Sequence, residues 1–567
     1  MIRLPYMVYS GDSAKKYNVS FGGLDLTENA SEGELKFSRN LDSSRFPYLA
    51  SRKPKFRSEE LYDGESGTGV LSLWGDGETM ALFRGERGSV GSVVGFKTYG
   101  KEYSDVWDLN ALWTLGEEKH DAMVRCGSYL LAFTDTETAH ENGNVAPLYF
   151  NLNEAPKDQL GWRSVGCYVN GMAVFEGDKL SLSYAITVGG SLGLCDFEAG
   201  DTLTITDCTV APENCLTLKL TSVEYVEGGM ELTFDGASFT NCAEDGVSVS
   251  RRVPERLRFP VVVNNRVWGV TSSEICACAL GDPTNWEQFE GIASDSYKVA
   301  VDSGLDFTGS GVYNSNPVFF KENAIYRLYG SLPSNFTLQR LDVSGVMEGC
   351  HKSVCKINEA LYYKGRRGVY RYTGGVPVCI SECLGDLSQY GDAVAGEDGR
   401  KLYISMRKDD EGYLFVYDTE TGVWFIEDNV KVLGFAKFGS VLYYLDDSCC
   451  LNSYTSDPDA ALTFEEKDPV GWEMEFAPVN EVVKEQKVYS KITLRMELEG
   501  CSAAIVCVRR DGGAWEEVAS VNSRDYRGMM HIPIPPKKCD SFALKIKGFG
   551  QMCLKGIVRE YRTAGDR

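Results

Sequence analysis

A short strand motif recurs along the 567-residue chain at intervals of about 40 residues. Each copy has a polar turn, a small or apolar residue, an aliphatic residue and then an aromatic residue. The clearest copies are residues 323–326, 359–362, 400–403 and 440–443, and their aliphatic positions are 36, 41 and 40 residues apart. A repeat of ~40–45 residues is typical of the four-stranded blades of a β-propeller.

The segments that follow these motifs also have strand patterns. Residues 368–372 and 413–418 alternate as half-buried strands do, and a turn at 419–422 leads into a further strand at 423–425. Weaker copies of the motif lie upstream, at residues 80–83, 129–131 and 266–268. Because the first and last blades of a propeller usually share strands, these seven copies predict closure with six or seven blades.

Two further β-domains interrupt or follow the repeat. The weak copies at Leu130 and Val267 are 137 residues apart, which leaves about 95 residues more than one blade needs. Short alternating strands fill this gap and predict a small inserted β-barrel or sandwich at residues 155–253. From Gly471 the repeat ends, and longer alternating strands predict a C-terminal β-sandwich.

The composition favours an all-β fold, because 59 Gly, 30 Tyr and 26 Phe suit many short strands joined by tight turns. The sequence therefore predicts an all-β protein, a six- or seven-bladed β-propeller with an inserted small β-barrel or sandwich and a C-terminal β-sandwich. The expected segments are an N-terminal arm with the first strands (1–60), the first part of the propeller (61–154), the insert (155–253), the second part of the propeller (254–470) and the sandwich (471–567).

The charge is strongly negative and unevenly distributed. Its net value is −23, so the chain as a whole has no electrostatic reason to bind nucleic acid. Residues 487–567 hold 15 Lys/Arg and 9 Asp/Glu, a net +6, which leaves −29 on residues 1–486. The C-terminal part either faces a different neighbour from the rest or has a basic solvated surface.

No stretch of the chain suggests export or membrane insertion. The N-terminus has no apolar run of signal-peptide length, and no segment reaches the ~18 consecutive apolar residues of a membrane span. The 18 Cys are scattered through a long chain, as free buried thiols are, and do not form a dense disulfide framework. We therefore expect synthesis and folding in a cytosol.

Several turn and blade segments resemble proteins encoded in the tail modules of phages and prophages of Gram-positive gut bacteria. The propeller bodies of those proteins are similar to the tail nozzle (DNA-stabilisation) proteins of short-tailed phages. The similarity follows most of the chain in order and is weaker in the insert. The segments that support it are residues 17–24, 40–41, 47–54, 279–286, 317–322, 330–336, 368–370 and 534–540.

This resemblance implies a structural virion protein of the phage tail, assembled in the bacterial host cytoplasm. It further implies a homo-oligomeric ring, a hexamer, below the portal and adaptor, with the propellers forming a wall around the channel through which DNA leaves. Genomic DNA would pass without specific binding, since a basic lining would retain a polyanion by counterion release. The alternative within this class is a receptor-facing or decoration tail protein whose insert binds a host glycan.

Enzyme and metal chemistry receive little support from the sequence. The four histidines, His120, His140, His351 and His531, are not at metal-ligand spacing. The cysteine pairs include no Cys-x-x-Cys motif; they are Cys276/Cys278, Cys350/Cys355, Cys379/Cys383 and Cys449/Cys450. The Gly-rich segment 85–88 lacks the Lys-Ser/Thr ending of a phosphate-binding loop.

A propeller glycosidase of the tail is the remaining catalytic hypothesis. Residues 509–515 approach the Ser-x-Asp-x-Gly-x-x-Trp box of sialidases, but they lie outside the propeller, are one residue short and suit a hairpin turn. The carboxylate pairs Asp409/Asp410 and Asp446/Asp447 fall in predicted turns, where Asp is favoured for local hydrogen bonding. The sequence therefore predicts a non-enzyme, with no catalytic, cofactor-binding or metal-binding residue and no cofactor.

Overall fold

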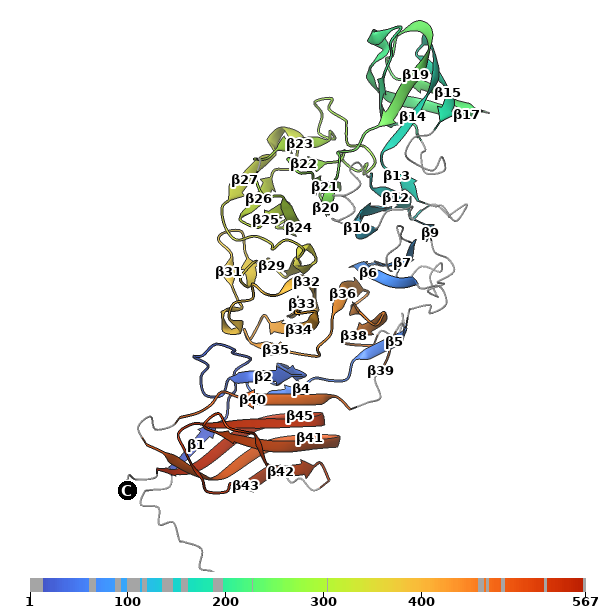
Figure 1. Ribbon diagram of the computed structural model, residues 1–567. Helices are drawn as coiled ribbons and strands as arrows, with labels where there is room; N and C mark the ends of the chain where they lie inside the picture. The colour runs from blue at the N-terminus through green and yellow to red at the C-terminus, as the bar shows by residue number, and fades with distance from the viewer. Residues whose placement is uncertain are drawn as a thin grey trace, which may run out of the picture.

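The computed structural model describes residues 14–60, 68–86, 93–98, 113–114, 120–134, 146–153, 162–186, 197–226, 228–302, 304–456, 463–465, 469–480, 485–524 and 528–563. These residues form strands and short 3-10 turns, which confirms the all-β prediction. The turns are η3 (Pro212–Asn214), η4 (Pro333–Asn335), η5 (His351–Ser353) and η6 (Glu382–Leu384). In Figure 1 a small barrel, a propeller and a C-terminal sheet follow one another along an elongated molecule. Within the described part, no helix is long and apolar enough to cross a membrane.

The first blades of the propeller lie on either side of the barrel in sequence. Blade 1 contains β6 (Thr68–Gly77), β7 (Thr79–Glu86), β8 (Val93–Thr98) and β9 (Trp113–Thr114). Blade 2 contains β10 (His120–Cys126), β11 (Tyr129–Thr134), β12 (Leu148–Asn151) and β13 (Arg163–Ser164). Blade 3 contains β20 (Arg258–Val263), β21 (Arg266–Val270), β22 (Glu274–Ala277) and β23 (Tyr297–Ala300).

The next three blades follow one another without interruption. Blade 4 contains β24 (Phe307–Tyr313), β25 (Asn316–Lys321), β26 (Ala324–Tyr329) and β27 (Thr337–Leu341). Blade 5 contains β28 (Cys355–Ile357), β29 (Ala360–Lys364), β30 (Val369–Tyr372) and β31 (Val378–Cys379). Blade 6 contains β32 (Gly391–Glu397), β33 (Lys401–Lys408), β34 (Glu411–Asp418) and β35 (Trp424–Ile426).

The last blade closes the ring with a strand from the N-terminal side. It contains β36 (Val432–Phe438), β37 (Val441–Asp446), β38 (Cys450–Ser453) and β5 (Phe56–Glu60), with β39 (Phe464–Glu465) beside β5. Its inner strand β36 also pairs in parallel with β6 of blade 1, at Lys437 with Asp76 and Phe438 with Gly77. The described strands thus form a closed ring of seven blades, one of the two blade numbers predicted.

One of the recurring motifs was aligned on the wrong strand. Six copies fall on the second strand of a blade, but residues 323–326 fall on β26, the third strand of blade 4. The second strand there is β25, which has its own run of apolar and aromatic residues, Val318 to Phe320. Both β25 and β26 have an aliphatic residue before an aromatic one, so the motif was matched to β26 instead of β25. This error produced the short spacing of 36 residues.

The insert is a closed six-stranded barrel between blades 2 and 3, as predicted. Its strand order is β14-β15-β18-β17-β16-β19, and β14 pairs with β19 to close it. The strands are β14 (Cys167–Gly177), β15 (Lys179–Ile186), β16 (Thr202–Thr206), β17 (Thr217–Val226), β18 (Gly229–Phe234) and β19 (Phe239–Arg251). Its apolar core is separate from those of the propeller and includes Phe175, Leu203 and Val249.

The C-terminal sheet is built from both ends of the chain. The C-terminal part supplies β40 (Gly471–Phe476), β41 (Lys487–Arg510), β42 (Glu516–Asn522), β43 (Met529–Pro533), β44 (Lys538–Cys539) and β45 (Phe542–Thr563). The N-terminal part supplies β1 (Ala14–Asn18), β2 (Leu35–Arg39), β3 (Leu41–Asp42) and β4 (Leu49–Ser51). The N-terminal strands β1 and β4 pair with β45, and β2 pairs with β40.

Candidate functional site

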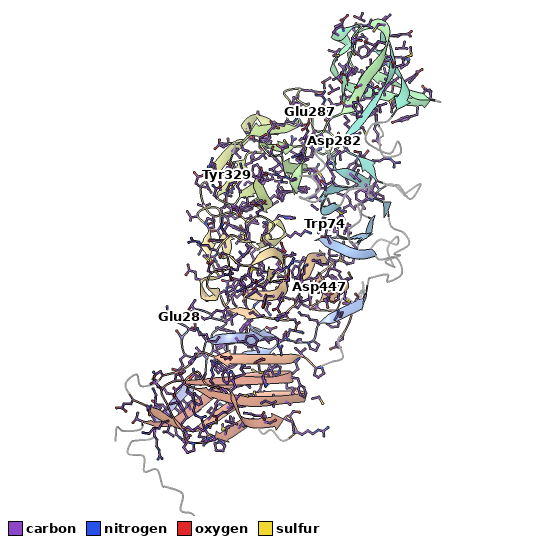
Figure 2. All side chains as sticks on the ribbon, viewed as in Figure 1. Glu28, Trp74, Asp282, Glu287, Tyr329 and Asp447 are labelled. Carbon is purple, nitrogen blue, oxygen red and sulfur yellow. The ribbon has the colours of Figure 1, made fainter. Side chains whose placement is uncertain are left out.

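A cavity of about 360 Å³ lies at the centre of the propeller, within the size range of small-ligand pockets. All seven blades contribute to its wall, through the innermost strands β6, β10, β20, β24, β32 and β36 and through the segment of η5 that precedes β28. Trp74 on β6 is one of these residues and is labelled in Figure 2. The cavity is therefore a product of ring closure.

The inner strands around this cavity have irregular geometry. The inner strands β6, β10, β20, β24, β32 and β36 each have a register shift near their first residues. Such bulges bend a strand and re-aim its side chains. Phe259, within the bulge of β20, has a φ of +52°, a conformation that is strained for a bulky residue.

Two basic side chains contribute to the wall. Arg258 and Lys352 line the cavity together with the His351 imidazole, and its described wall includes no Asp or Glu. The Lys352 amine donates a hydrogen bond to Ser72 Oγ, 3.1 Å away. Ser72 lies on β6 of blade 1, whereas Lys352 precedes β28 of blade 5. The blades that contain β32 and β36 stand between these two in the ring, so the Lys352 side chain crosses the channel.

Arg258 is almost fully enclosed, with 5% of its side chain exposed. Burial lowers the pKa of its guanidinium group, and Asp306 at 4.0 Å, itself half exposed, opposes that shift. The guanidinium also lies 5.5 Å from the centre of the Phe259 ring, at cation–π distance. Arg258 therefore contributes a largely desolvated positive charge to the cavity wall.

Aromatic rings complete the wall. The Phe259 and His351 rings are 5.4 Å apart, and Trp74 and Phe435 come from the neighbouring inner strands β6 and β36. Phe435 lies against Gly396 of β32, where a Cβ atom would approach its Cγ to 2.5 Å. The cavity therefore combines flat apolar surfaces with fixed positive charge, a combination that nothing in the sequence pattern indicated.

The histidines and cysteines considered from the sequence are dispersed. His531 Nδ1 lies 3.0 Å from Thr493 Oγ1 in the C-terminal sheet, whereas His351 lines the cavity. The side chain of His120 and the whole of His140 lie outside the described residues. Among the residues that the structure describes, no cluster of three or more His, Cys, Asp or Glu could hold a metal ion.

The cysteine pairs lie in and around the blades. Cys276 and Cys278 belong to the buried core between blades 2 and 3, and Cys278 Sγ accepts a hydrogen bond from the Val267 amide at 3.0 Å. Burial raises the pKa of the Cys276 thiol to about 12. Cys350, Cys355 and Cys450 are buried, while Cys379, Cys383 and Cys449 are half-buried.

Both carboxylate pairs occupy hairpin turns, as predicted. Asp409 and Asp410 connect β33 to β34 with positive φ angles of 51° and 66°, and Asp410 forms an ion pair with Arg407. Asp446 is buried and accepts hydrogen bonds from the amides of Ser448 and Cys450 at 3.0 and 2.9 Å. These contacts shape the turns and do not place two acids across the cavity.

The segment 509–515 forms the hairpin turn between β41 and β42. Asp511 and Gly512 have positive φ angles of 49° and 68°, and Asp511 accepts hydrogen bonds at 2.8 Å from the amides of Asp540 and Ser541. Arg509 packs over the Trp515 ring at 4.5 Å. The tryptophan of the sialidase-like segment is therefore covered by a cation of its own sheet.

Buried charged groups also join the propeller to the C-terminal sheet. Lys55, 3% exposed, lies 2.8 Å from Glu427 and 3.2 Å from Asp428, between the rings of Tyr444 and Tyr454. Although burial disfavours its charge, Glu427 and the other neighbours raise the pKa of Lys55. Lys55 lies between β4 of the C-terminal sheet and β5 of the last blade, and its partners follow β35 of blade 6, so the contact anchors the chain where it passes from the sheet into the propeller.

Asp418 makes a second buried contact at the same junction. Its carboxylate accepts hydrogen bonds from Ser43 Oγ at 2.5 Å and from the Arg400 guanidinium at 2.6 and 3.0 Å. Ser43 follows β3 of the C-terminal sheet, whereas Asp418 ends β34 in blade 6. A continuous apolar cluster, which includes Phe21, Leu35 and Trp424, fills the space beside these polar contacts.

The barrel is held to the propeller in a similar way. Arg251, 2% exposed, donates hydrogen bonds to Asp201 at 2.6 Å and to the carbonyls of Ser164 and Val165 at 2.8 Å. Ser164 is the last residue of blade 2, and Arg251 is the last residue of the barrel. Both chain crossings between the modules are thus fixed by one buried guanidinium.

Comparisons with known proteins leave the family open. No family model matches, and no curated protein matches. Among solved structures, an exo-β-1,3-galactanase from Phanerochaete chrysosporium is 9% identical, with 53% of this chain and 95% of that chain covered and a TM-score of 0.22. Hsv2 from Kluyveromyces lactis is 7% identical, with 63% and 97% covered and a TM-score of 0.25. An acylaminoacyl peptidase from Pyrococcus horikoshii is 9% identical, with 74% and 59% covered and a TM-score of 0.31. At such values none of them informs the activity of this chain.

Proposed function

We propose that the chain is a non-catalytic structural protein of a bacteriophage tail. In this proposal six copies form a ring below the portal and adaptor, and their propellers surround the channel through which DNA leaves. The observation that carries the proposal is the end-to-end arrangement of three β-modules, with buried charged contacts at both junctions (Figure 1). A ring subunit requires a shape that is fixed along the whole molecule.

The nature of the junctions supports this role. Domains joined by ordinary linkers move relative to one another unless their interface is large and apolar. Here a shared apolar cluster and the contacts of Lys55 and Asp418 fix one junction, while Arg251 fixes the other. Removing one partner of a buried ion pair is strongly destabilising, so these contacts oppose hinge motion.

The propeller channel itself offers no route for DNA in this proposal. Lys352 crosses it, and its cavity has the size of a small-ligand pocket. A duplex would therefore pass between subunits, along their outer surfaces. The net charge of −29 on residues 1–486 suits such a path, because acidic walls do not retain a polyanion.

The uneven charge supports distinct neighbours at the two ends. Residues 14–51, which join the C-terminal sheet, hold five Lys/Arg and five Asp/Glu, so they leave the net +6 of residues 487–567 unchanged. The barrel and most of the propeller belong to the acidic part. Opposite charge at the two ends favours one orientation between stacked tail components.

Mass photometry and negative-stain imaging of the purified chain, alone and with the portal and adaptor proteins of the same phage, would test this proposal. We expect a ring with a central channel that is enriched or stabilised by the adaptor. The Arg252→Met variant, which alters an exposed residue beside Arg251, should assemble normally. A chain that stays monomeric at all concentrations and ignores both proteins would refute the proposal.

A receptor-facing tail protein is the second candidate, because the barrel exposes large apolar side chains. Tyr168 and Met172 lie on the same face of β14 and are 44% and 50% exposed. Contiguous exposed apolar patches mark binding surfaces in many proteins. Glycan-array binding that is lost in Tyr168→Ala would favour this candidate, and release of sugars from host polysaccharides would instead favour a glycosidase.

A further inference from the structure

The loop between β16 and β17 of the barrel brings two cysteine side chains together. Cys208 and Cys215 lie on either side of the short turn η3, and their side chains form a hydrogen bond with each other. Cys208 belongs to the apolar core of the barrel, whereas Cys215 is exposed. Solvent therefore reaches one thiol of the pair directly, and the second thiol is in contact with the first.

Backbone hydrogen bonds fold this loop back on itself. At its base, the Ile205 amide of β16 donates a hydrogen bond to the Leu216 carbonyl at 2.8 Å. At its far side, the Cys215 amide donates to the Pro212 carbonyl at 3.1 Å and closes η3. The chain therefore turns back sharply between the two cysteines.

Contacts with β19 hold the loop beside each cysteine. Glu244 Oε2 accepts hydrogen bonds from the amides of Thr209 and Val210 at 2.6 and 2.7 Å. The Asn214 side chain donates to the Thr240 carbonyl and accepts from the Thr240 amide, both at 2.9 Å. Glu244 and Asn214 are buried. Each cysteine is thus next in sequence to a residue that the barrel holds in place.

This arrangement favours a bond between the two sulfur atoms. A disulfide forms only where the two cysteines are close and their side chains point toward each other. Side chains that already share a hydrogen bond, on a loop fixed at both ends, satisfy this requirement without a large movement of the backbone. The entropy of bringing the thiols together is therefore lost when the barrel folds and not when the bond forms.

We propose that Cys208 and Cys215 form a reversible disulfide when the chain meets a low-molecular-mass disulfide such as oxidised glutathione. The Cys215 thiolate attacks one sulfur of glutathione disulfide, forms a mixed disulfide and releases one glutathione. Cys208 then attacks Cys215 Sγ and releases the second glutathione. The two protein thiols are oxidised, the glutathione disulfide is reduced to two thiols, and these take up the two protons.

The order of the two attacks follows from burial. Burial and the contact with Cys215 raise the pKa of the Cys208 thiol, so its thiolate is scarce and it reacts second. That second attack is intramolecular, and proximity compensates for the small thiolate fraction. Because each attack requires a thiolate, we expect the disulfide to form faster as the pH rises from 7 toward 9.

The disulfide would restrain a loop that presents apolar side chains to solvent. Val210 is 65% exposed and Leu216 is 37% exposed. Thiols stay reduced in a cytosol, whereas disulfides persist on virion surfaces. The loop would thus be closed covalently only after release of the particle. This timing rests on the proposed tail function, whereas the chemistry of the pair does not.

Peptide mapping of the purified full chain tests the proposal after incubation with oxidised glutathione and trapping of free thiols with N-ethylmaleimide. Cleavage after glutamate separates the two cysteines at Glu213 and puts Cys242 in a third peptide. We expect peptides 199–213 and 214–224 to be joined until dithiothreitol is added. Glutathione that stays attached to Cys215, a link from Cys208 to Cys242, or no reaction of either thiol would overturn the proposal.

Single substitutions separate the pair from its exposed member. In Cys208→Ser, Cys215 has no second thiol to release the glutathione, so the mixed disulfide should accumulate. In Cys215→Ser, the buried Cys208 should stay reduced. Cys501→Ser removes another exposed thiol, on β41, and should leave the link unchanged. Loss of the link in a folded Cys501→Ser protein would contradict the assignment, and mapping of the unaltered chain needs no variant to fold.

Hydrogen exchange measured by mass spectrometry tests the effect on the loop. Amides of residues 209–214 should exchange more slowly in the oxidised chain than in the reduced chain, because the disulfide limits local opening. Amides of β41, which is outside the barrel, should exchange equally in both states. Equal exchange of residues 209–214 in both states would show that the disulfide does not restrain the loop.

Discussion

At the scale of single residues, the junction between the propeller and the C-terminal sheet makes stability depend on pH. Burial would raise the pKa of Asp418, but the hydrogen bonds from Arg400 and Ser43 hold it at about 2. Asp428 has a pKa of about 2 as well, because Lys55 and Arg52 outweigh its desolvation. Both carboxylates therefore stay charged in the folded protein at pH values where an unfolded chain begins to take up protons.

The pH dependence follows from these depressed pKa values. Stability from Asp418 is fully present above its unfolded pKa near 4 and is lost as the pH falls from 4 to 2, by about 2 kcal/mol. We expect the urea midpoint to fall over this window. In Asp418→Asn the fall should be shallower, and an unchanged pH profile in that variant would contradict the assignment.

Lys55 provides a second test at this scale. Lys55→Met leaves Glu427, 6% exposed, as a buried carboxylate without its amine, and we expect a loss of about 3–5 kcal/mol in the free energy of unfolding. Adding Glu427→Leu should recover much of the loss, because the unpaired charge is then removed. Lys53→Met, at an exposed neighbouring position, should change stability by less than about 0.5 kcal/mol in the same urea titration.

At the scale of elements, ring closure depends on the close approach of β36 and β6. A Cβ atom on Gly434 would lie 2.7 Å from the Leu73 carbonyl oxygen and 2.9 Å from its amide nitrogen, and backbone atoms cannot move away easily. We expect Gly434→Ala to lower the urea midpoint by an amount equivalent to about 1–3 kcal/mol. Gly391→Ala should be nearly neutral, because a Cβ atom at this position of inner strand β32 would meet no other atom within 4 Å.

Local sequence patterns predicted where strands form better than they predicted which strands pair with each other. The repeated motif indicated blades because each copy follows a polar turn with consecutive apolar and aromatic residues, which form a buried second strand at residues 400–403 and 440–443. The contribution of β1 to β4 to the C-terminal sheet was not predicted, since pairing across some 500 residues, such as Leu49 with Leu554, leaves no local trace. The cavity was missed for the same reason, because the residues that line it come from seven blades and face one space only after the ring closes.

At the scale of the whole molecule, the account requires the barrel and the propeller to keep one orientation. Arg251→Met removes the hydrogen bonds to Asp201, Ser164 and Val165 together, so we expect a broader distribution of barrel positions in class averages from electron microscopy. Arg252→Met, at the exposed neighbour, should give the narrow distribution of the unaltered chain. Equal distributions in all three proteins would show that this junction does not depend on Arg251.

The most direct test of the central proposal is the position of this chain in an intact phage particle, determined by electron cryomicroscopy. Its elongated outline, with the barrel and the C-terminal sheet at opposite ends of the propeller, gives a distinctive shape to fit (Figure 1). The account predicts copies in a ring around the DNA channel below the portal and adaptor. Density found only as single copies away from the tail axis, or missing from the particle, would contradict it.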